Sequence, residues 1–362
     1  MPITVNREDL NAACAAIASV AKKDGVSPAS SMAFLSGKDG ALEVKATDLD
    51  NWLMLDVAAS AGAIKEPIQV DAFKLAELVS KMRGDDLKLD AVDGSLTIAG
   101  AKGSKRKLAG LVTAYPEIAV VEGEAATVAV NTMRAAIDFA APSMAGDDKI
   151  TYQAVRLHDG NAVAYNGSGL AAAEVGPVPD VTIASGTISL LKWIPGGETV
   201  TVTVGDRLVS FAWDGGSLVS KQQEGDWPFL RGGLDAILPE HDNTLLVSPT
   251  DLSTAIVAVR AVAADDKLSK SKIVTLLLSA KGCVVSVQSQ AGEATEPFDA
   301  EWSGADIKVN MSASRLGFIL KGFAPDMPVA IGITALGDDK PKGSVIRQDA
   351  KPGFVGMLAQ IR

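Results

Sequence analysis

The order of hydrophobic and polar positions along the chain repeats three times. Each segment runs through a strand, an amphipathic helix, several strands, a second helix and further strands. The first helices are predicted in three stretches that start at positions 5, 130 and 247: VNREDLNAACAAIASVAKK, VNTMRAAIDFAAPSMAG and VSPTDLSTAIVAVRAVAA. A period of roughly 120 residues is that of whole domains, not of the short units of a solenoid.

Each predicted first helix carries apolar residues every three or four positions, which is typical of a helix with one buried face. In the first segment these residues are Leu10, Ala13, Ile17 and Val20. A small polar residue follows a valine at each start, so we expect Asn6, Asn131 and Ser248 to be the N-caps. Pro249 suits the first helical turn of the third segment.

The second helices are predicted in VDAFKLAELVSKMRG from Val70, IASGTISLLKWIPGG from Ile183 and VNMSASRLGFILKGF from Val309. Alternating polar and apolar residues follow each of them, as in DDLKLDAVDGSLTIAG, and such alternation predicts β-strands. The sequence therefore predicts an α+β protein of three similar domains, each with two helices packed on antiparallel sheets. The predicted domains are residues 1–121, 126–240 and 243–362.

Composition is typical of a soluble globular protein, with 47% hydrophobic and 22% charged residues in 362. No apolar run approaches the roughly 20 residues that cross a bilayer. The first ten residues, MPITVNREDL, lack the basic and apolar parts of a signal peptide. Cys14 and Cys283 are the only cysteines and are far apart, which argues against a disulfide framework. We expect a cytoplasmic protein.

The net charge of −10 disfavours binding of nucleic acid over the whole surface, because phosphates would be repelled. A local basic face on an acidic body remains compatible with this average.

Motifs for catalysis are missing from the sequence. It has no phosphate-binding Gly-Lys-Ser loop, no zinc-ligand spacing and no nucleophile elbow. The two histidines, His158 and His241, are expected at the surface or in turns. Asp-Asp-Lys recurs from Asp147, Asp265 and Asp338, where solvated turns are the ordinary explanation. We therefore expect no enzyme, no cofactor and no metal.

Several longer motifs occur in a fixed order over the three segments. The first holds VNREDL, EVKATDLDNWLMLDV, IQVDAFKLAELV and SKRKLAGLVTAYPEI; the second holds NTMRAAIDFAAPSMAGDDKITYQ, AVAYNGSGLAAAEV and LVSKQQEGDWPFLRGGLDAILP; the third holds SGADIKVNMSASRLGFIL and FVGMLAQIR. In order and spacing, essentially the whole chain resembles the bacterial beta sliding clamp, the beta subunit of DNA polymerase III.

The resemblance implies a head-to-tail homodimeric ring around duplex DNA, with basic helices facing the hole. Such side chains would contact phosphates and not bases, so that the ring holds any sequence and slides. Solvated helix faces are the alternative explanation for each cation. The second segment departs from the family, since Ser185 and Gly186 stand where basic residues are usual. The candidate DNA-binding residues are Lys22, Lys23, Lys74, Lys81, Arg83, Arg134, Lys192, Arg260, Arg315 and Lys321.

The resemblance also implies a hydrophobic pocket for short peptides of polymerase, clamp loader and repair proteins. The family's Asp-Gly-His-Arg turn is replaced here by Asn-Gly-Ser-Gly from Asn166, and the terminal Met-Pro-Met core is missing, so peptide preference is expected to differ. The apolar terminal segment from Phe354 to Ile361 is alternatively just the last strand of a sheet. The candidate pocket residues are Tyr165, Gly167, Leu170, Pro228, Val355, Met357 and Leu358.

A third implied surface is the dimer interface, formed by edge strands within KGSKRKLAGL and GEATEPFDAEWSG. Opposite charges on the two strands would fix the head-to-tail register. A nucleic-acid patch or a charged loop is the alternative for the basic stretch, and Arg106 replaces a family aromatic residue. The candidate interface residues are Lys105, Arg106, Lys107, Leu108, Glu293, Glu296 and Asp299.

The resulting hypothesis is a non-enzymatic processivity factor for DNA polymerase III, whose partners are double-stranded DNA, a second copy of itself, the polymerase alpha subunit and the clamp loader. The alternative is an adaptor of the same fold that binds partner peptides without encircling DNA. Whether the protein is the main chromosomal clamp or an extra plasmid or phage copy is left open by the sequence.

Overall fold

The computed structural model describes residues 2–25, 27–38, 40–64, 66–117, 120–146, 150–197, 199–263, 273–289, 292–334 and 343–361. The three Asp-Asp-Lys segments lie outside the described residues. The chain forms two compact units, which we call unit 1 (Met1–Asn131 and Gly186–Gln222) and unit 2 (Thr132–Ser185 and Gln223–Arg362). The predicted boundaries of three domains stay a prediction.

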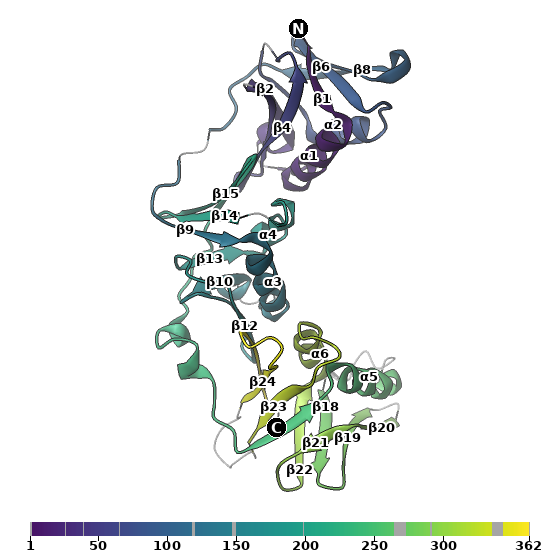
Figure 1. Ribbon diagram of the computed structural model, residues 1–362, viewed down its shortest axis with the longest axis vertical. Coiled ribbons are helices and arrows are strands. Elements are labelled where there is room, and N and C mark those ends of the chain that lie inside the picture. Colours follow the sequence, from purple (N-terminus) through teal and green to yellow (C-terminus); the bar gives the residue numbers. More distant parts are fainter. Residues whose placement is uncertain are drawn as a thin grey trace. The chain divides into compact units, whose positions relative to one another are not determined.

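Unit 1 is built on one sheet of twelve strands, in the order β1-β6-β7-β8-β5-β2-β3-β4-β16-β15-β14-β9. Helices α1 (Arg7–Val20) and α2 (Ala72–Ser80) lie side by side (Figure 1). The short helix α4 (Ser185–Ile188) begins at the unit's border. The strands are β1 (Ile3–Asn6), β2 (Met32–Lys38), β3 (Ala41–Thr47), β4 (Asn51–Ala61), β5 (Ile68–Asp71), β6 (Asp86–Val92), β7 (Ser95–Ala99), β8 (Lys105–Leu111), β9 (Glu124–Ala129), β14 (Thr199–Val204), β15 (Leu208–Trp213) and β16 (Gly216–Lys221).

Unit 2 has two sheets, of nine strands in the order β13-β10-β11-β12-β25-β24-β23-β17-β21 and of four in the order β20-β19-β18-β22. Its helices are α3 (Val130–Ala140, which begins at the border), α5 (Pro249–Arg260) and α6 (Ala313–Lys321). The strands are β10 (Ala154–His158), β11 (Asn161–Tyr165), β12 (Gly169–Glu174), β13 (Val181–Ala184), β17 (Asn243–Val247), β18 (Ile273–Ser279), β19 (Gly282–Ser289), β20 (Gly292–Phe298), β21 (Ala300–Trp302), β22 (Ile307–Ser312), β23 (Val329–Ile333), β24 (Gly343–Arg347) and β25 (Phe354–Ala359).

All six predicted helices are present, and two of the three predicted N-caps are confirmed. Asn6 Oδ1 accepts hydrogen bonds from the backbone N–H groups of Glu8 (2.8 Å) and Asp9 (3.3 Å). Ser248 Oγ accepts one from the N–H of Asp251 (3.4 Å). The prediction for Asn131 is wrong, because α3 begins one residue earlier, at Val130. Side-chain oxygens at N-caps satisfy N–H groups that have no partner within the helix.

The second helix of the middle segment is much shorter than predicted. Only Ser185–Ile188 is α-helical, and a 3-10 turn at Leu191–Trp193 follows. A glycine and β-branched residues in the stretch SGTI disfavour a longer helix. Apolar residues in and after this stretch are nevertheless mostly buried, since Leu191 and Ile194 are 2% and 1% exposed.

The C-terminal strand β25 lies in the middle of the nine-stranded sheet, between β12 and β24. One of its faces lies against α6, because a Cβ atom added to Gly356 would come within 2.4 Å of Ile319 Cγ2. Glycine is required at such a close approach. The apolar C-terminal segment therefore completes a core, and only the face opposite α6 is left for other contacts. Within the described residues, no helix combines the length and apolar character needed to cross a membrane.

Candidate partner-binding site

The register of the nine-stranded sheet brings four predicted pocket residues together on one face. Tyr165 pairs with Leu170, and Leu170 pairs with Met357 across the β12–β25 border. Ala172 pairs with Val355 one row further along the strands. Directly paired residues project from the same face of a sheet, and so do residues two apart on one strand. Tyr165, Leu170, Val355 and Met357 therefore share the face opposite α6.

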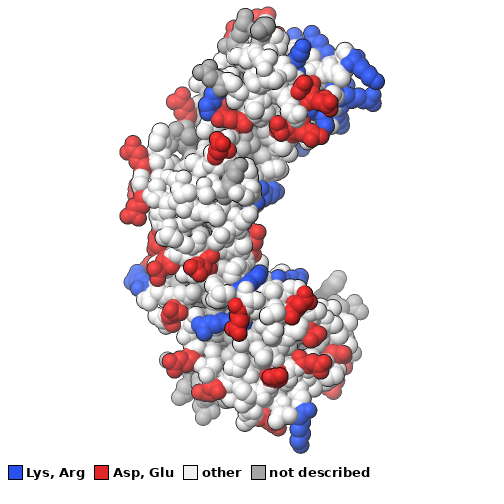
Figure 2. All heavy atoms as spheres, viewed as in Figure 1, with Lys and Arg blue, Asp and Glu red and all other residues white. Residues whose placement is uncertain are grey.

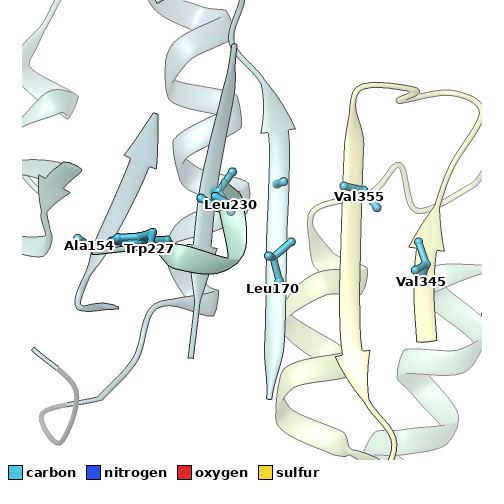
Figure 3. Close-up of a cluster of buried hydrophobic side chains, with 8 residues drawn as sticks. Ala154, Leu170, Trp227, Leu230, Val345 and Val355 are labelled. Carbon is cyan, nitrogen blue, oxygen red and sulfur yellow. The ribbon is translucent and has the colours of Figure 1, made fainter. Parts of the chain in front are cut away.

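The segment that follows β16 covers this face of the sheet. Trp227, the N-cap of the 3-10 turn Pro228–Leu230, is 3% exposed. Leu230, at the end of this turn, is 1% exposed. They form one hydrophobic cluster with Leu170, Val355 and Val345, as Figure 3 shows. We call residues 227–238 the connector, since they run from this cluster towards β17. The connector and the sheet together build the candidate site.

Four aromatic rings hold the connector on the sheet. Ring centroids are 4.7 Å apart for Tyr165 and Phe229, 5.2 Å for Tyr152 and Trp227, and 5.5 Å for Tyr152 and Tyr165. The two contacts of Tyr152 are edge-on, a geometry that adds to the gain from burial. Burial raises the pKa of Tyr165, and neighbouring Tyr152 adds to the shift, so its hydroxyl keeps its proton at neutral pH.

Two clefts border the connector. The larger, about 700 Å³, lies between the β10–β11 turn, the end of β12, the start of β25 and the connector. The second, about 510 Å³, shares Asp235, Leu238 and Arg347 with the first. These volumes are in the range of sites for small ligands and peptide anchors. Carboxylates of Asp159, Glu174 and Asp235 line the larger cleft, whose apolar wall includes Val355.

The remaining three predicted pocket residues lie apart from this face. Gly167 is exposed in the β11–β12 turn, and Pro228 is exposed at the start of the connector. Leu358 follows Met357 on β25 and therefore projects to the opposite side, towards α6, where it is 2% exposed. We accordingly leave Leu358 out of the candidate site.

Sequence reasoning missed the aromatic residues of the site. Tyr152, Trp227 and Phe229 were not among the candidates, although DWPFLR was a matching motif. The available signal was the presence of aromatic residues in a polar connecting segment, because such side chains are usually buried against another part of the protein. Which surface they cover depends on the pairing of β12 with β25, which are more than 180 residues apart in the chain.

The candidate DNA-binding cations of unit 1 lie at or near helix ends. Lys22 and Lys23 follow α1, and Lys22 Nζ forms an ion pair with Asp48 (2.8 Å). Lys23 Nζ lies 5.1 Å from the ring centroid of Phe73 on α2. Lys81 Nζ pairs with Glu77 (2.5 Å). The exposed members of this group are Lys22, Lys23, Lys74, Lys81, Arg83 and Lys192.

In unit 2 the candidate cations sit on three helices. Arg134 lies on α3 and Arg260 ends α5, while Arg315 and Lys321 lie on α6. Arg260 and Lys321 are exposed, and Arg134 and Arg315 are half-buried. Lys321 Nζ lies 5.9 Å from the ring centroid of Phe318, itself 49% exposed. Each unit thus has cations on helices, as contact with phosphates would require.

Both predicted interface strands have an unpaired edge among the described residues. Strand β8 pairs with β7 along its length but with β5 only at Gly110 and Leu111. Basic side chains gather over β8 in Figure 2, where Lys105, Arg106 and Lys107 are exposed and Leu108 is 9% exposed. Strand β20 is the edge of the four-stranded sheet, and Glu293, Glu296 and Asp299 on or after it are exposed.

Unit 1 has an apolar cleft of its own, of about 600 Å³. It lies over β4 and β16, which pair at Trp52 and Val219. The segment after β8 contributes Tyr115, whose ring centroid is 5.0 Å from that of Phe34. Burial raises the pKa of the Tyr115 hydroxyl, so the group stays neutral. No metal-binding group of three or more His, Cys, Asp or Glu side chains occurs in the described part of the chain.

Comparison with known proteins gives a consistent result. No protein-family model matches the chain. Two curated relatives, the beta sliding clamps of two strains of Caulobacter vibrioides, are 25% identical over 340 residues, which cover 87% of this chain and 89% of theirs.

Solved structures match over the full length. The DNA polymerase III beta subunit of Thermotoga maritima has a TM-score of 0.85 at 17% identity, with 99% of both chains covered. A sliding clamp of Pseudomonas aeruginosa has a TM-score of 0.88 at 19% identity, with 100% of both chains covered, and a structure of that clamp is bound to griselimycin.

The fold is therefore that of a sliding clamp, with mixed α+β architecture and antiparallel sheets. The chain is similar over 87% of its length to curated beta sliding clamps, which confirms the resemblance that the sequence motifs indicated.

Proposed function

We propose that this protein is a processivity clamp that encircles duplex DNA as a head-to-tail homodimer and slides without sequence preference. The observation that carries the proposal is the sliding-clamp fold over the whole chain, together with homology to a beta sliding clamp over 87% of it. Three domains, at residues 1–121, 126–240 and 243–362, would then contribute two helices each to the lining of the ring.

DNA would be held by enclosure more than by affinity. The candidate cations, on helices of both units, offer contacts to phosphates but carry no base-reading pattern. With a net charge of −10, the protein repels DNA at long range. A clamp loader therefore has to open the ring and place it around the DNA. The expected place of action is the cytoplasm, where the chromosome lies.

Ring closure would join β8 of one copy to β20 of the next. Both are edge strands, and exposed edges pair readily with another chain. The three cations on β8 and the three carboxylates at β20 have opposite charge, which favours the head-to-tail arrangement over self-pairing of either edge.

Partners would dock on the β12–β25 face and the connector. Half-buried Tyr165 and Met357 lie at the surface of a rigid cluster, and short peptides bind such surfaces through a few apolar anchors. The alpha subunit of the polymerase and the clamp loader are the expected carriers of these peptides. Griselimycin, bound by the Pseudomonas aeruginosa clamp, is a ready probe.

The test is loading on nicked circular DNA with a compatible clamp loader. The protein should stay on closed circles through gel filtration and leave once the circle is cut, because a linear duplex has ends to slide from. A triple variant, Lys105→Glu with Arg106→Glu and Lys107→Glu, should be monomeric by ultracentrifugation and should not stay on circles. A wild-type protein that is a stable monomer and never stays on circles, yet binds peptides, would support the adaptor instead.

A further inference from the structure

His158 lies between two hydrogen-bond acceptors that belong to different parts of unit 2. Its Nδ1 is 2.5 Å from Asp180 Oδ2, and its Nε2 is 3.0 Å from the carbonyl oxygen of Leu230. A carboxylate and a carbonyl can only accept, so both ring nitrogens must donate to satisfy both contacts. A neutral imidazole has one N–H group. Only the doubly protonated, cationic ring makes both bonds.

Asp180 is a firm anchor for this ring. Its carboxylate accepts from Arg156 Nη2 (3.4 Å) and from the backbone N–H of Asp159 (3.3 Å). Arg156 also donates to Thr182 Oγ1 (3.1 Å), which ties β10 to β13. The charged groups on the elements that contact the ring are Arg156, Asp159 and Asp180 on the sheet side, and Arg231, paired with Asp226, and Asp235 on the connector.

The other acceptor belongs to the connector. The Leu230 side chain is 1% exposed in the cluster with Leu170 and Val355. Its carbonyl also accepts from the backbone N–H of Gly233 (2.9 Å), and that turn leads into Leu234, which lines the larger cleft. The position of this one carbonyl therefore fixes where the connector crosses the sheet.

We propose that His158 is a positioning residue for partner binding, whose protonated ring fastens the connector to the β10–β11 hairpin and holds the cleft in its binding shape. This inference rests on the proposed peptide site. Loss of the second ring proton breaks one of the two bonds, the connector loosens, and partners bind more weakly. Partner affinity therefore depends on both ring protons of His158 being present.

The ring state can be observed directly by NMR of protein labelled with ¹⁵N-histidine. The chain has only two histidines, so the signals of His158 are those that His158→Gln removes. Both ring nitrogens of His158 should show the protonated form at about pH 6. A singly protonated ring at that pH would overturn the proposal.

Positioning is measured by hydrogen exchange of the connector and by calorimetry with griselimycin as the probe. His158→Phe removes both bonds, so we expect faster exchange in residues 227–238 and about fivefold weaker binding at pH 6. His158→Gln keeps an amide donor, so its connector exchange and its binding should lie between those of His158→Phe and the wild type.

A matched variant separates protonation from mere packing. Asp180→Asn supplies an amide N–H that a neutral ring can accept, so His158 Nε2 can donate to Leu230 at any pH. Connector exchange and binding should then no longer depend on pH. An unchanged pH profile in this variant, or wild-type exchange in His158→Phe, would refute the proposal. A wild-type protein that does not bind the probe would count against the proposed site, while connector exchange would still decide the role of His158.

Discussion

Two turns, one in each unit, have the same hydrogen bonds but different chemistry. In the β3–β4 turn the N–H of Asp48 donates to the Asn51 carbonyl (3.2 Å), and in the β11–β12 turn the N–H of Asn166 donates to the Gly169 carbonyl (3.1 Å). In both, Oδ1 of the first residue accepts from the N–H groups of the third and fourth residues, at 3.1 and 2.7 Å in unit 1 and at 3.2 and 3.0 Å in unit 2. The same turn, with the same pattern of hydrogen bonds, thus precedes both β4 and β12.

The differences between the turns are in charge and conformation. The first residue is a carboxylate paired with Lys22 in unit 1 and a neutral amide in unit 2. The second residue has a positive φ in both, 74° at Leu49 and 93° at Gly167, a region that costs a side-chain-bearing residue about 1 kcal/mol. The turn of unit 1 depends on an ionised group and tolerates strain, whereas the turn beside the candidate partner site has neither feature.

The strands that follow the turns lead to unlike surfaces. Over β4 the cleft of about 600 Å³ has a tilted aromatic pair, Phe34 and Tyr115. Over β12 the connector brings four aromatic rings together. We infer that the connector of unit 2 is the more firmly held of the two covering segments.

The largest expected effect comes from Trp227→Ala. Trp227 is 3% exposed and contacts two other rings, so its removal should cost about 3–5 kcal/mol in the free energy of unfolding. Tyr115→Ala is the matched change in unit 1 and should cost less, because that ring is only half-buried. Hydrogen exchange resolved by peptide would assign each loss to its unit. Equal losses would contradict the difference in rigidity.

Binding provides the second prediction. Met357→Glu places a charge on the face shared with Tyr165 and Leu170 and should weaken griselimycin binding at least about tenfold, since an unpaired charge is costly in an apolar contact. Met54→Glu, a methionine in the cleft of unit 1, is the control and should bind like the wild type. The opposite pattern in calorimetry would move the binding site to unit 1.

The third prediction is that the β3–β4 turn of unit 1 is sensitive to acid and the β11–β12 turn of unit 2 is not. Burial acts to raise the pKa of Asp48, but the bonds from Lys22 and from the backbone N–H groups of Asn51 and Asp50 outweigh it and lower the pKa below 3.8. A lowered pKa stabilises the folded state at neutral pH, and this contribution is lost as pH falls below 3.8. Asp48→Asn should cost about 1 kcal/mol at pH 7 and little near pH 3.

Asn166→Asp is its counterpart in unit 2 and should make that turn sensitive to acid. Denaturant unfolding followed at both pH values would compare the variants. A penalty for Asp48→Asn that is the same at pH 3 and pH 7 would contradict the role of the charge.

The smallest effect concerns the second turn residue. Gly167→Ala should destabilise unit 2 by about 1 kcal/mol, because alanine is disfavoured at a φ of 93°. Leu49→Gly relieves strain in unit 1 but loses a half-buried side chain, so its net change should stay within about 1 kcal/mol. Thermal unfolding of the two variants would reveal whether the turns differ in strain; a costless Gly167→Ala would show that they do not.

Local features of the fold were predictable from the sequence. The helices and the caps at Asn6 and Ser248 depend on residues a few positions apart. The third cap failed, since α3 starts before Asn131. The shortness of α4 could have been predicted from SGTI, but the helical spacing of the apolar residues that follow favoured a longer helix.

The candidate site was predictable in part. The apolar terminal strand and the motif containing Tyr165 pointed to two strands that the structure pairs through β12. Alternation along β25 also implied that Met357 and Leu358 project to opposite sides, but not which side faces α6. That depends on Gly356, which lets Ile319 approach the strand.

The sequence by itself therefore determined the three repeated segments, the element types and the family resemblance, because these rest on local periodicity and short motifs. The tertiary structure alone decided that β25 pairs with β12, that the rings of the connector cover this pair, and that His158 meets both Asp180 and Leu230. Such contacts join residues far apart in the chain, and their register is chosen by the packing of whole sheets and helices, which no local pattern encodes.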